Sequence, residues 1–227
     1  MNSLHFVQKT QLASDIFQFD FEPTSPIAYA AGQFGEFYQR LPEGGTHSRW
    51  LSLSSSPTEN VISFITRISA NPSVYKNQLQ HLQPGHSITM SAPMGDFVAP
   101  RDKKIPMIFI TAGIGISPVR SICRFLTDTA QSRKLFLFYI AKSENDFILL
   151  DELKSCASHI ELTTGHPHSS KILQFYQQHK AVSQSYSPRI YISGPETIAT
   201  AISHQLIQAG VDQLHIVTDY FSGYSSL

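Results

Sequence analysis

Beyond residue 100, the chain alternates short apolar runs with segments patterned as helices. The apolar runs are Ile105–Thr111, Leu135–Ile140, Ser158–Leu162, Arg189–Ser193 and Gln213–Val217. The helix-like segments lie around Val119–Leu126, Leu149–Ser155 and Glu196–Ala209. Strands that are buried on both faces and alternate with helices are typical of a parallel, doubly wound α/β sheet. Such sheets bind ligands at the carboxyl ends of their strands, so the loops that follow the strands are the first candidates for a functional site.

Residues 1–100 carry a different pattern. Phe17, Phe19 and Phe21 alternate with polar residues, which is the period of a half-buried strand. Gln33–Arg40 and Val61–Ile68 are also strand-like, and one short helix is expected over 74–82. Short strands at this spacing predict a closed β-barrel or a sandwich. A length of 227 residues accommodates two small domains, which we place at residues 1–100 and 101–227.

Composition excludes several classes of function. The 17 Lys and Arg residues balance the 17 Asp and Glu residues, and a neutral chain is a poor nucleic-acid binder because phosphate attraction dominates that affinity. Two cysteines, Cys123 and Cys156, cannot make a four-cysteine zinc or iron–sulfur site, and we expect reduced thiols and no bound metal. The apolar runs are too short to span a membrane, so the sequence predicts a cytoplasmic protein.

The sharpest motif is the glycine loop Thr111–Pro118, which follows an apolar strand and opens a helix. Gly113 and Gly115 let the backbone turn tightly and approach a ligand closely. Ser117 suits a helix cap and Pro118 the first helical position. The free N–H groups at the start of a helix favour a pyrophosphate. A purely structural turn between strand and helix also needs glycines, and the motif alone leaves that alternative open.

Two further segments are candidates. Ser193, Gly194 and Pro195 form a second strand-to-helix turn, which is either a plain corner or the second wall of a nucleotide crevice. In the barrel region, Arg49 begins a hydroxyl-rich run to Pro57. An arginine followed by serines is able to bind a phosphate and a polar ring edge, although an edge strand with solvated serines has the same pattern.

The order of these pieces resembles the ferredoxin–NADP⁺ reductase superfamily, in which an antiparallel Greek-key barrel that binds flavin precedes an α/β domain that binds nicotinamide. The superfamily's RxYS and following serine and proline correspond to Arg49, Ser52, Ser55 and Pro57, with Leu51 in place of the tyrosine. Ser73, Lys76 and the run to Gly85 fit its second flavin segment, and 92–97 fits the end of the barrel. The nicotinamide loop corresponds to 112–118, the later strand end to 193–195 and the closing segment to 219–224.

The resemblance implies a role for each matching residue. Ser52, Ser193 and Phe221 become the candidate catalytic residues, with Ser52 beside the hydride-accepting nitrogen of the flavin, Ser193 beside the nicotinamide and Phe221 flanking the flavin. The candidate cofactor-binding residues are Arg49, Trp50, Leu51, Ser52, Ser55, Ser73, Lys76, Gly113, Gly115, Ser117, Pro118, Gly194 and Pro195. Within this set, Arg49, Ser73 and Lys76 would approach the flavin phosphates. Because Leu51 cannot stack as the tyrosine does, the flavin would be held either less tightly or by another aromatic such as Trp50.

The function that the resemblance implies is an FAD-dependent NAD(P)H oxidoreductase. A hydride would pass from NADPH or NADH to FAD, and the electrons onward to ferredoxin, flavodoxin or a small acceptor such as free flavin or a quinone. Lys142 and Ser143 follow the second parallel strand, where the 2′-phosphate of NADPH could lie, but an exposed lysine there is equally consistent with a solubilising role, so the choice between NADH and NADPH stays open. The alternative is a nucleotide-binding electron-transfer or regulatory subunit of a larger complex.

Overall fold

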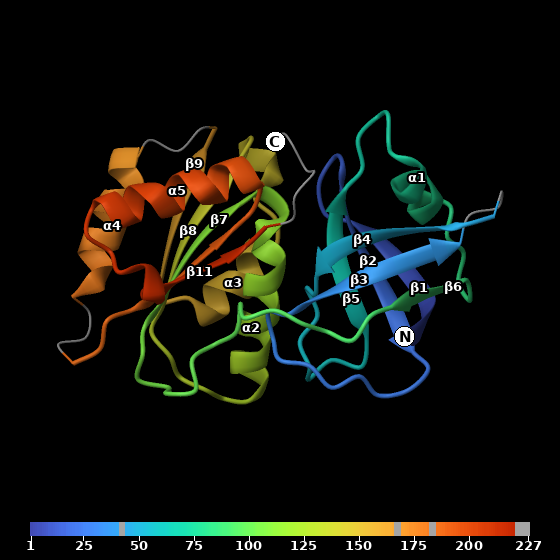
Figure 1. Ribbon diagram of the computed structural model, residues 1–227, viewed down its shortest axis with the longest axis horizontal. Helices are drawn as coiled ribbons and strands as arrows, with labels where there is room; N and C mark the ends of the chain where they lie inside the picture. Colours follow the sequence, from blue (N-terminus) through green and yellow to red (C-terminus); the bar gives the residue numbers. More distant parts are fainter. Residues whose placement is uncertain (41–43, 166–168, 182–184, 221–227) are drawn as a thin grey trace.

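The computed structural model describes residues 1–40, 44–165, 169–181 and 185–220. An antiparallel sheet and a parallel sheet lie side by side (Figure 1). The last antiparallel strand ends at Met90 and the first parallel strand begins at Met107. Both predicted sheet types are confirmed. Residue 100 falls in the link between them, and the division into two domains at that residue remains a prediction.

The antiparallel sheet has six strands in the order β4-β3-β6-β1-β2-β5. Their bounds are β1 Asn2–Gln11, β2 Ile16–Pro23, β3 Phe34–Arg40, β4 Thr46–Ser52, β5 Ile62–Arg67 and β6 Ser87–Met90. Strand β6 lies between β1 and β3, so the sheet order departs from the chain order as in a Greek key. The short helix α1, Val74–Gln80, confirms the helix expected in this region.

The sheet rolls into a barrel that is not fully closed, which corrects the prediction of a closed barrel. Within the described residues, edge strands β4 and β5 are joined by an isolated bridge between Leu53 and Phe64 and by the hydrogen bond from Ser54 N to Ser63 O. The reason is that the chain leaves the sheet after Ser54 and turns toward the second half of the molecule. Phenylalanines fill the interior, and the rings of Phe19 and Phe21 each stack on the ring of Phe64 with centroids 5.5 Å apart.

The parallel sheet has five strands in the order β11-β10-β7-β8-β9. Their bounds are β7 Met107–Ala112, β8 Leu135–Ala141, β9 His159–Thr164, β10 Arg189–Ser193 and β11 Ile216–Asp219. The helices are α2 Ile116–Asp128, α3 Leu150–Cys156, α4 Ser169–Lys180 and α5 Glu196–Gln208, with 3₁₀ turns η1 Gly113–Gly115, η2 Glu144–Asp146 and η3 Gln213–His215. The strand expected over 213–217 begins only at Ile216, because the Asp212 side chain accepts from Leu214 N and closes η3.

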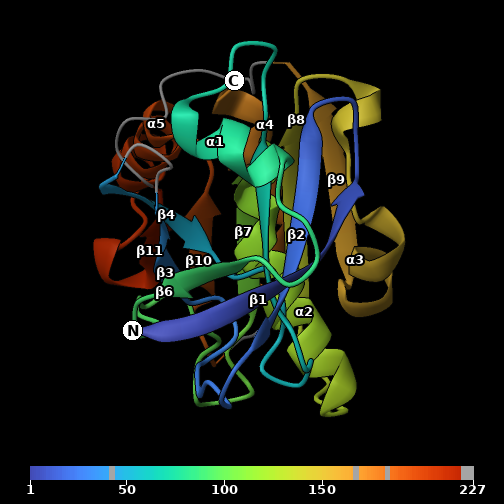
Figure 2. The same ribbon diagram turned by 90° about the vertical axis from the view of Figure 1, so that its right-hand side faces the viewer.

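Alternate side chains of each parallel strand face opposite layers of helices. Phe109 and Leu137 pack with α2 and α3, whereas Ile108 and Phe138 pack with α4 and α5. The sheet is therefore doubly wound, as predicted. From β7 the chain adds β8 and β9 on one side and then returns to add β10 and β11 on the other. The strand order thus reverses between β7 and β10, which is where such sheets form a ligand crevice. Figure 2 views the molecule from the barrel side, with the barrel strands in front of the parallel sheet.

Candidate functional site

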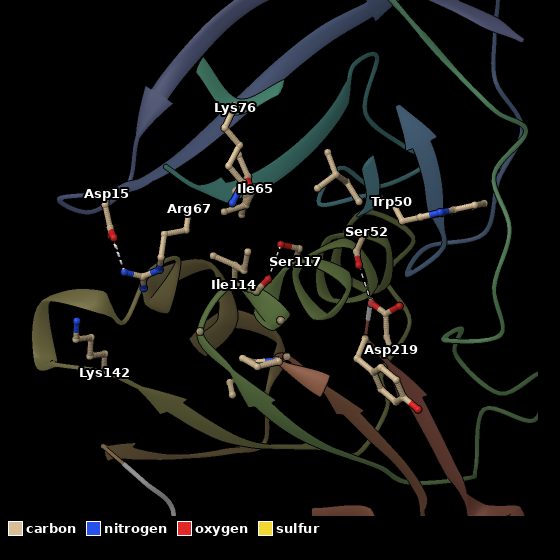
Figure 3. Close-up of a pocket in the computed structure, with 18 of the residues that line it drawn as sticks. Asp15, Trp50, Ser52, Ile65, Arg67, Lys76, Ile114, Ser117, Lys142 and Asp219 are labelled. Atoms are coloured by element: carbon tan, nitrogen blue, oxygen red, sulfur yellow. Dashed lines mark hydrogen bonds and ion pairs between the residues drawn. The ribbon is translucent and has the colours of Figure 1, made fainter. Parts of the chain in front are cut away.

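A cavity of about 480 Å³ opens between the barrel and the carboxyl end of the parallel sheet (Figure 3). The barrel contributes the end of β4, the end of β5 and Lys76 of α1. The sheet contributes the loops after β7 and β10 and the end of β11. Ligand sites typically occupy roughly 300–1,000 Å³, so the space suits a small-molecule ring system.

The predicted glycine loop forms one wall of this cavity. Gly113 has a φ of +56°, and Gly113, Gly115 and Ser117 all line the space. The capping prediction is wrong in detail, because α2 begins at Ile116 and Ser117 lies inside its first turn. There the Ser117 hydroxyl donates to the Ile114 carbonyl over 2.7 Å. Pro118 is the third helical residue, still in the turn where backbone N–H groups have no partner within the helix. It is buried and does not line the cavity.

Two glycines hold the loops after β7 and β10 against each other. A Cβ on Gly115 would lie 2.5 Å from the carbonyl carbon of Ser193 and 2.6 Å from Gly194 N. A Cβ on Gly194, whose φ is +139°, would lie 2.8 Å from the Ala112 carbonyl oxygen. The Ser193 hydroxyl donates to the Gly115 carbonyl over 2.7 Å. Gly115 is thus required first for loop-to-loop packing. Gly194 and Pro195 reach the cavity, whereas Ser193 binds the neighbouring loop.

A partly buried hydrogen bond joins the barrel to the sheet at the wall of the cavity. The Ser52 hydroxyl, at the end of β4, donates to Asp219 Oδ2, at the end of β11, over 2.6 Å. Asp219 is only 8% exposed. Burial raises the pKa of its carboxyl to about 6, and the hydrogen bond from Ser52 lowers the pKa by a smaller amount. The arrangement places a carboxyl that titrates near neutral pH next to a hydroxyl inside a ligand-sized space.

Cationic side chains line the barrel side and one end of the cavity. Arg67, Lys76 and Lys142 all border it. Asp15 accepts two hydrogen bonds of 2.7 Å from Arg67 Nη1. Burial, and then the nearby charge of Arg49, lower the pKa of Lys76. A concentration of positive charge next to helix-start N–H groups favours a ligand that carries phosphates.

Arg49 and Ser73 lie next to Lys76 but do not line the cavity themselves. The Arg49 guanidinium stands 5.4 Å from the centre of the Tyr75 ring, in the first turn of α1, and its Nη1 donates to the Ser48 carbonyl over 2.7 Å. Ser73 caps α1 by accepting from Lys76 N at 3.5 Å.

The remaining barrel candidates divide between the cavity and the core. Trp50 and Leu51 line the space; Trp50 is 38% exposed and its ring meets Phe34 edge-on at 5.6 Å, whereas Leu51 is 6% exposed. Ser55 lies in the core instead, where its hydroxyl accepts from Ser63 N over 2.9 Å and stands 3.1 Å from Tyr29 Oη. Its surroundings give it a structural role and no access to the cavity.

Phe221, the third candidate catalytic residue, lies outside the described residues, while its neighbour Tyr220 borders the cavity. Across 1–40, 44–165, 169–181 and 185–220, no three His, Cys, Asp or Glu side chains come together as a metal site. In the same part of the chain, no helix has the length and apolar character needed to cross a membrane. Cys123 and Cys156 are free thiols.

Comparison with known proteins places this fold. Residues 109–204 match the family described as oxidoreductase NAD-binding domain. The structure superimposes on ferredoxin–NADP⁺ reductase from Plasmodium falciparum with a TM-score of 0.82, covering 96% of this chain and 95% of that one at 18% identity. The chain therefore has the two-domain fold of the ferredoxin–NADP⁺ reductases. The resemblance inferred from the motif order is thereby confirmed.

The chain also matches part of two curated proteins. The chain is 24% identical over 232 residues to flavohemoprotein A of Dictyostelium discoideum, covering 94% of this chain and 58% of that protein. It is 27% identical over 246 residues to one component of the Na⁺-translocating NADH-quinone reductase of Serratia proteamaculans, covering 96% of this chain and 60% of that protein. The chain therefore spans about three fifths of the length of these relatives.

Sequence reasoning within the superfamily pattern missed the Arg67–Asp15 pair. Arg67 ends the strand-like run that was recognised, but Asp15 stands 52 positions earlier in the β1–β2 turn. The pairing depends on how β2 and β5 are registered, with Ile16 opposite Arg67. The one local signal for Arg67 was that it is the only charged residue of the run 62–67 and stands at its end.

Proposed function

We propose that this chain is a flavin-dependent NAD(P)H oxidoreductase whose cofactors meet in the cavity between barrel and sheet. Bound FAD would supply the redox chemistry, by accepting a hydride from the nicotinamide and releasing the electrons onward one or two at a time. The observation that carries the proposal is the Ser52–Asp219 contact at the carboxyl end of β11, in the cavity that both glycine loops line. A hydroxyl, a protonatable carboxyl and two glycine-containing loops thus border one cavity.

The residues present fit these two cofactors. Leu51, Ile65 and Ile114 supply apolar walls for a flat ring system. Across the same space, Arg67, Lys76 and Lys142 supply positive charge for phosphates. The loops after β7 and β10 pack so closely that a Cβ on Gly115 or Gly194 would collide with the facing loop, and this packing holds both loops at the cavity wall. Apolar walls with a few cations at the rim are the chemistry that a dinucleotide requires.

Ser52 and Asp219 would act together at the reacting ring. Ser52 would orient the flavin edge with its hydroxyl, and Asp219 would hold a proton on its carboxyl below a pH of about 6. Gly194 and Pro195 would bound the nicotinamide, and Ser193 would support them through the Gly115 carbonyl. Phe221 remains a proposed cover for the flavin.

The phosphate groups would be held at the rim. Lys76 would meet the flavin phosphates, with Arg49 and Ser73 behind it fixing the start of α1. Arg67, which also lines the cavity, would bind the flavin phosphates together with Lys76. Lys142 would meet the 2′-phosphate of NADPH, because it follows β8 and lines the cavity together with the glycine loop. Ser143 is proposed beside it, although its hydroxyl donates to Asp146 Oδ2 over 3.0 Å.

The electrons would leave to a separate acceptor, because two cysteines are too few for an iron–sulfur cluster of four thiolates. An electron-carrier protein such as ferredoxin or flavodoxin is proposed first, and a small acceptor such as free flavin or a quinone second. The likeness to the quinone-reductase component over 96% of this chain favours one further candidate, an electron-transfer subunit of a larger complex.

The visible absorption spectrum of the purified protein tests the proposal. We expect flavin bands, bleached by NADPH or NADH under nitrogen and restored by an artificial acceptor such as ferricyanide. Ser52→Ala should retain the bands and bleach more slowly. A chain that stays colourless after reconstitution with FAD and oxidises no NAD(P)H would refute the enzyme and leave the regulatory subunit.

A further inference from the structure

Helix α2 connects the two halves of the site. Its first turn carries Ser117, which lines the cavity, and Arg120 follows three residues later. Arg120 is 8% exposed, which is unusual for a charged side chain and calls for full pairing. It points toward residues 54–59, the loop that leaves the barrel directly after the Ser52-bearing strand β4.

Arg120 binds this loop at two points. Its Nη1 donates to the Ser54 carbonyl over 3.0 Å and to Glu59 Oε2 over 2.5 Å, and its Nη2 donates to Glu59 Oε1 over 3.0 Å. The pair with Glu59 is bidentate, so it fixes an angle as well as a distance. Glu59 Oε2 also accepts from Ser56 N over 2.7 Å, which closes the loop on itself.

The other side of the guanidinium is anchored within the parallel-sheet half. Nε donates to Glu152 Oε2 of α3 over 3.0 Å, and Nη2 stands 2.9 Å from Glu152 Oε1. Two further residues of α2 form hydrogen bonds with the same barrel loop. The Ser121 hydroxyl donates to the Ser55 carbonyl over 2.5 Å, and Asp128, at the end of the helix, accepts from the Thr58 hydroxyl over 2.5 Å. The helix is thus docked along its length on one loop of the barrel.

We propose that Arg120 is a positioning residue that fixes the Ser52 strand relative to the glycine loop after β7. Ser54, which it binds, is two residues beyond Ser52, and Ser117 is one helical turn before Arg120. We call the contacts of Arg120 with Ser54 and Glu59 the Arg120 clamp. The clamp connects the strand that is proposed to face the flavin with the loop that is proposed to face the nicotinamide. This inference rests on the proposed function, because it concerns the spacing of the two reacting rings.

Hydride transfer is sensitive to such spacing. A misplacement of about 1 Å is able to reduce a rate by roughly a hundredfold, whereas cofactor affinity depends on many contacts that would remain. Loosening the clamp should therefore slow the chemical step and leave binding largely intact. The absorbance that arises when a reduced nicotinamide stacks on an oxidised flavin should also weaken, because it reports how closely the rings overlap.

The two glutamates offer a matched pair of variants. Glu59→Gln weakens the contact that crosses between the halves, and Glu152→Gln weakens the contact inside the second half. We expect the anaerobic flavin-reduction rate to fall at least fivefold in Glu59→Gln and tenfold or more in Arg120→Met, with cofactor dissociation constants within about twofold of wild type. Glu152→Gln should stay within twofold in rate, and Arg120→Lys should recover part of the Arg120→Met loss.

Hydrogen exchange gives a readout that needs no turnover. Amides of residues 54–59 should exchange faster in Glu59→Gln and at the wild-type rate in Glu152→Gln. Unchanged reduction rates in both Glu59→Gln and Arg120→Met overturn the inference, as does an equal loss in Glu152→Gln. If Arg120→Met does not fold, Glu59→Gln decides. A wild-type protein that reduces no flavin refutes the proposed function, and the positioning role with it, whereas a competent wild type with a competent Glu59→Gln refutes the positioning role alone.

Discussion

Replacing Asp219 by asparagine should stabilise the protein at neutral pH. The native carboxyl is buried and has a pKa of about 6, compared with an ordinary value of 3.8. Asparagine is nearly the same size and its Oδ1 is able to accept the same bond from Ser52. The substitution therefore removes the unfavourable burial of a charge and retains the packing and the hydrogen bond.

The magnitude follows from proton linkage. Between a pH of about 3.8 and about 6, the native carboxyl keeps a proton that the unfolded chain has released, so the stability of wild type falls as the pH rises through this window. A shift of about two pKa units corresponds to about 3 kcal/mol, and the loss is complete above about pH 7. The advantage of Asp219→Asn should accordingly grow by about 1.4 kcal/mol between pH 5 and pH 8.

Urea unfolding of both proteins at several pH values, with no nucleotide added, measures this difference. Ser52→Ala is the matched control: it removes the bond that opposes the shift, so the pKa of Asp219 should rise further and the pH dependence should extend to higher pH. A difference between Asp219→Asn and wild type that is constant from pH 5 to pH 8 would refute the reasoning. So would an asparagine variant that is less stable at pH 8.

Three other substitutions test the rest of the site. Gly115→Val should destabilise the fold by about 1–3 kcal/mol and weaken NAD(P)H binding, because its Cβ would collide with the Ser193 backbone; urea unfolding and nucleotide titration check this, and an unaltered protein would contradict it. Arg67→Ala should weaken FAD binding by about ten- to a hundredfold through loss of a charge-assisted contact, whereas Asp15→Asn, which leaves the cation in place, should not; flavin fluorescence titration distinguishes them. Lys142→Ala should raise the KM for NADPH and leave that for NADH unchanged, and steady-state kinetics with an artificial acceptor will show whether it does.

Much of the parallel sheet could be predicted because its strands are apolar on both faces. The run Arg189–Ser193 coincides with β10, and Leu135–Ile140 differs from β8 by one residue. Helix α4 was not predicted, because its sequence is rich in glutamine and lysine and only Ile172 and Phe175 of its described side chains are buried. Strand β1 was missed for a similar reason: its buried pair, Leu4 and Phe6, is followed by exposed residues.

The candidate site could be predicted where its signals are local. Glycines after β7 and β10 mark turns that any parallel sheet requires, and both loops do line the cavity. The partners of those glycines come from distant parts of the chain, however, and the collision that a Cβ on Gly115 would make with Ser193 cannot be read from either segment alone. Arg49 shows the same limit, because the stacking of its guanidinium on Tyr75 depends on where α1 lies over the barrel.

The central contacts of the site all cross the boundary predicted at residue 100. Ser52 meets Asp219 across 167 positions, and Arg120 meets Glu59 across 61. The raised pKa of Asp219 depends on burial, to which the barrel contributes at least the Ser52 strand that contacts it. Separating the halves would expose that carboxyl and lower its pKa toward 3.8, and it would leave Arg120 with only Glu152. The two predicted domains are therefore distinct in fold, but the proposed chemistry belongs to neither of them alone.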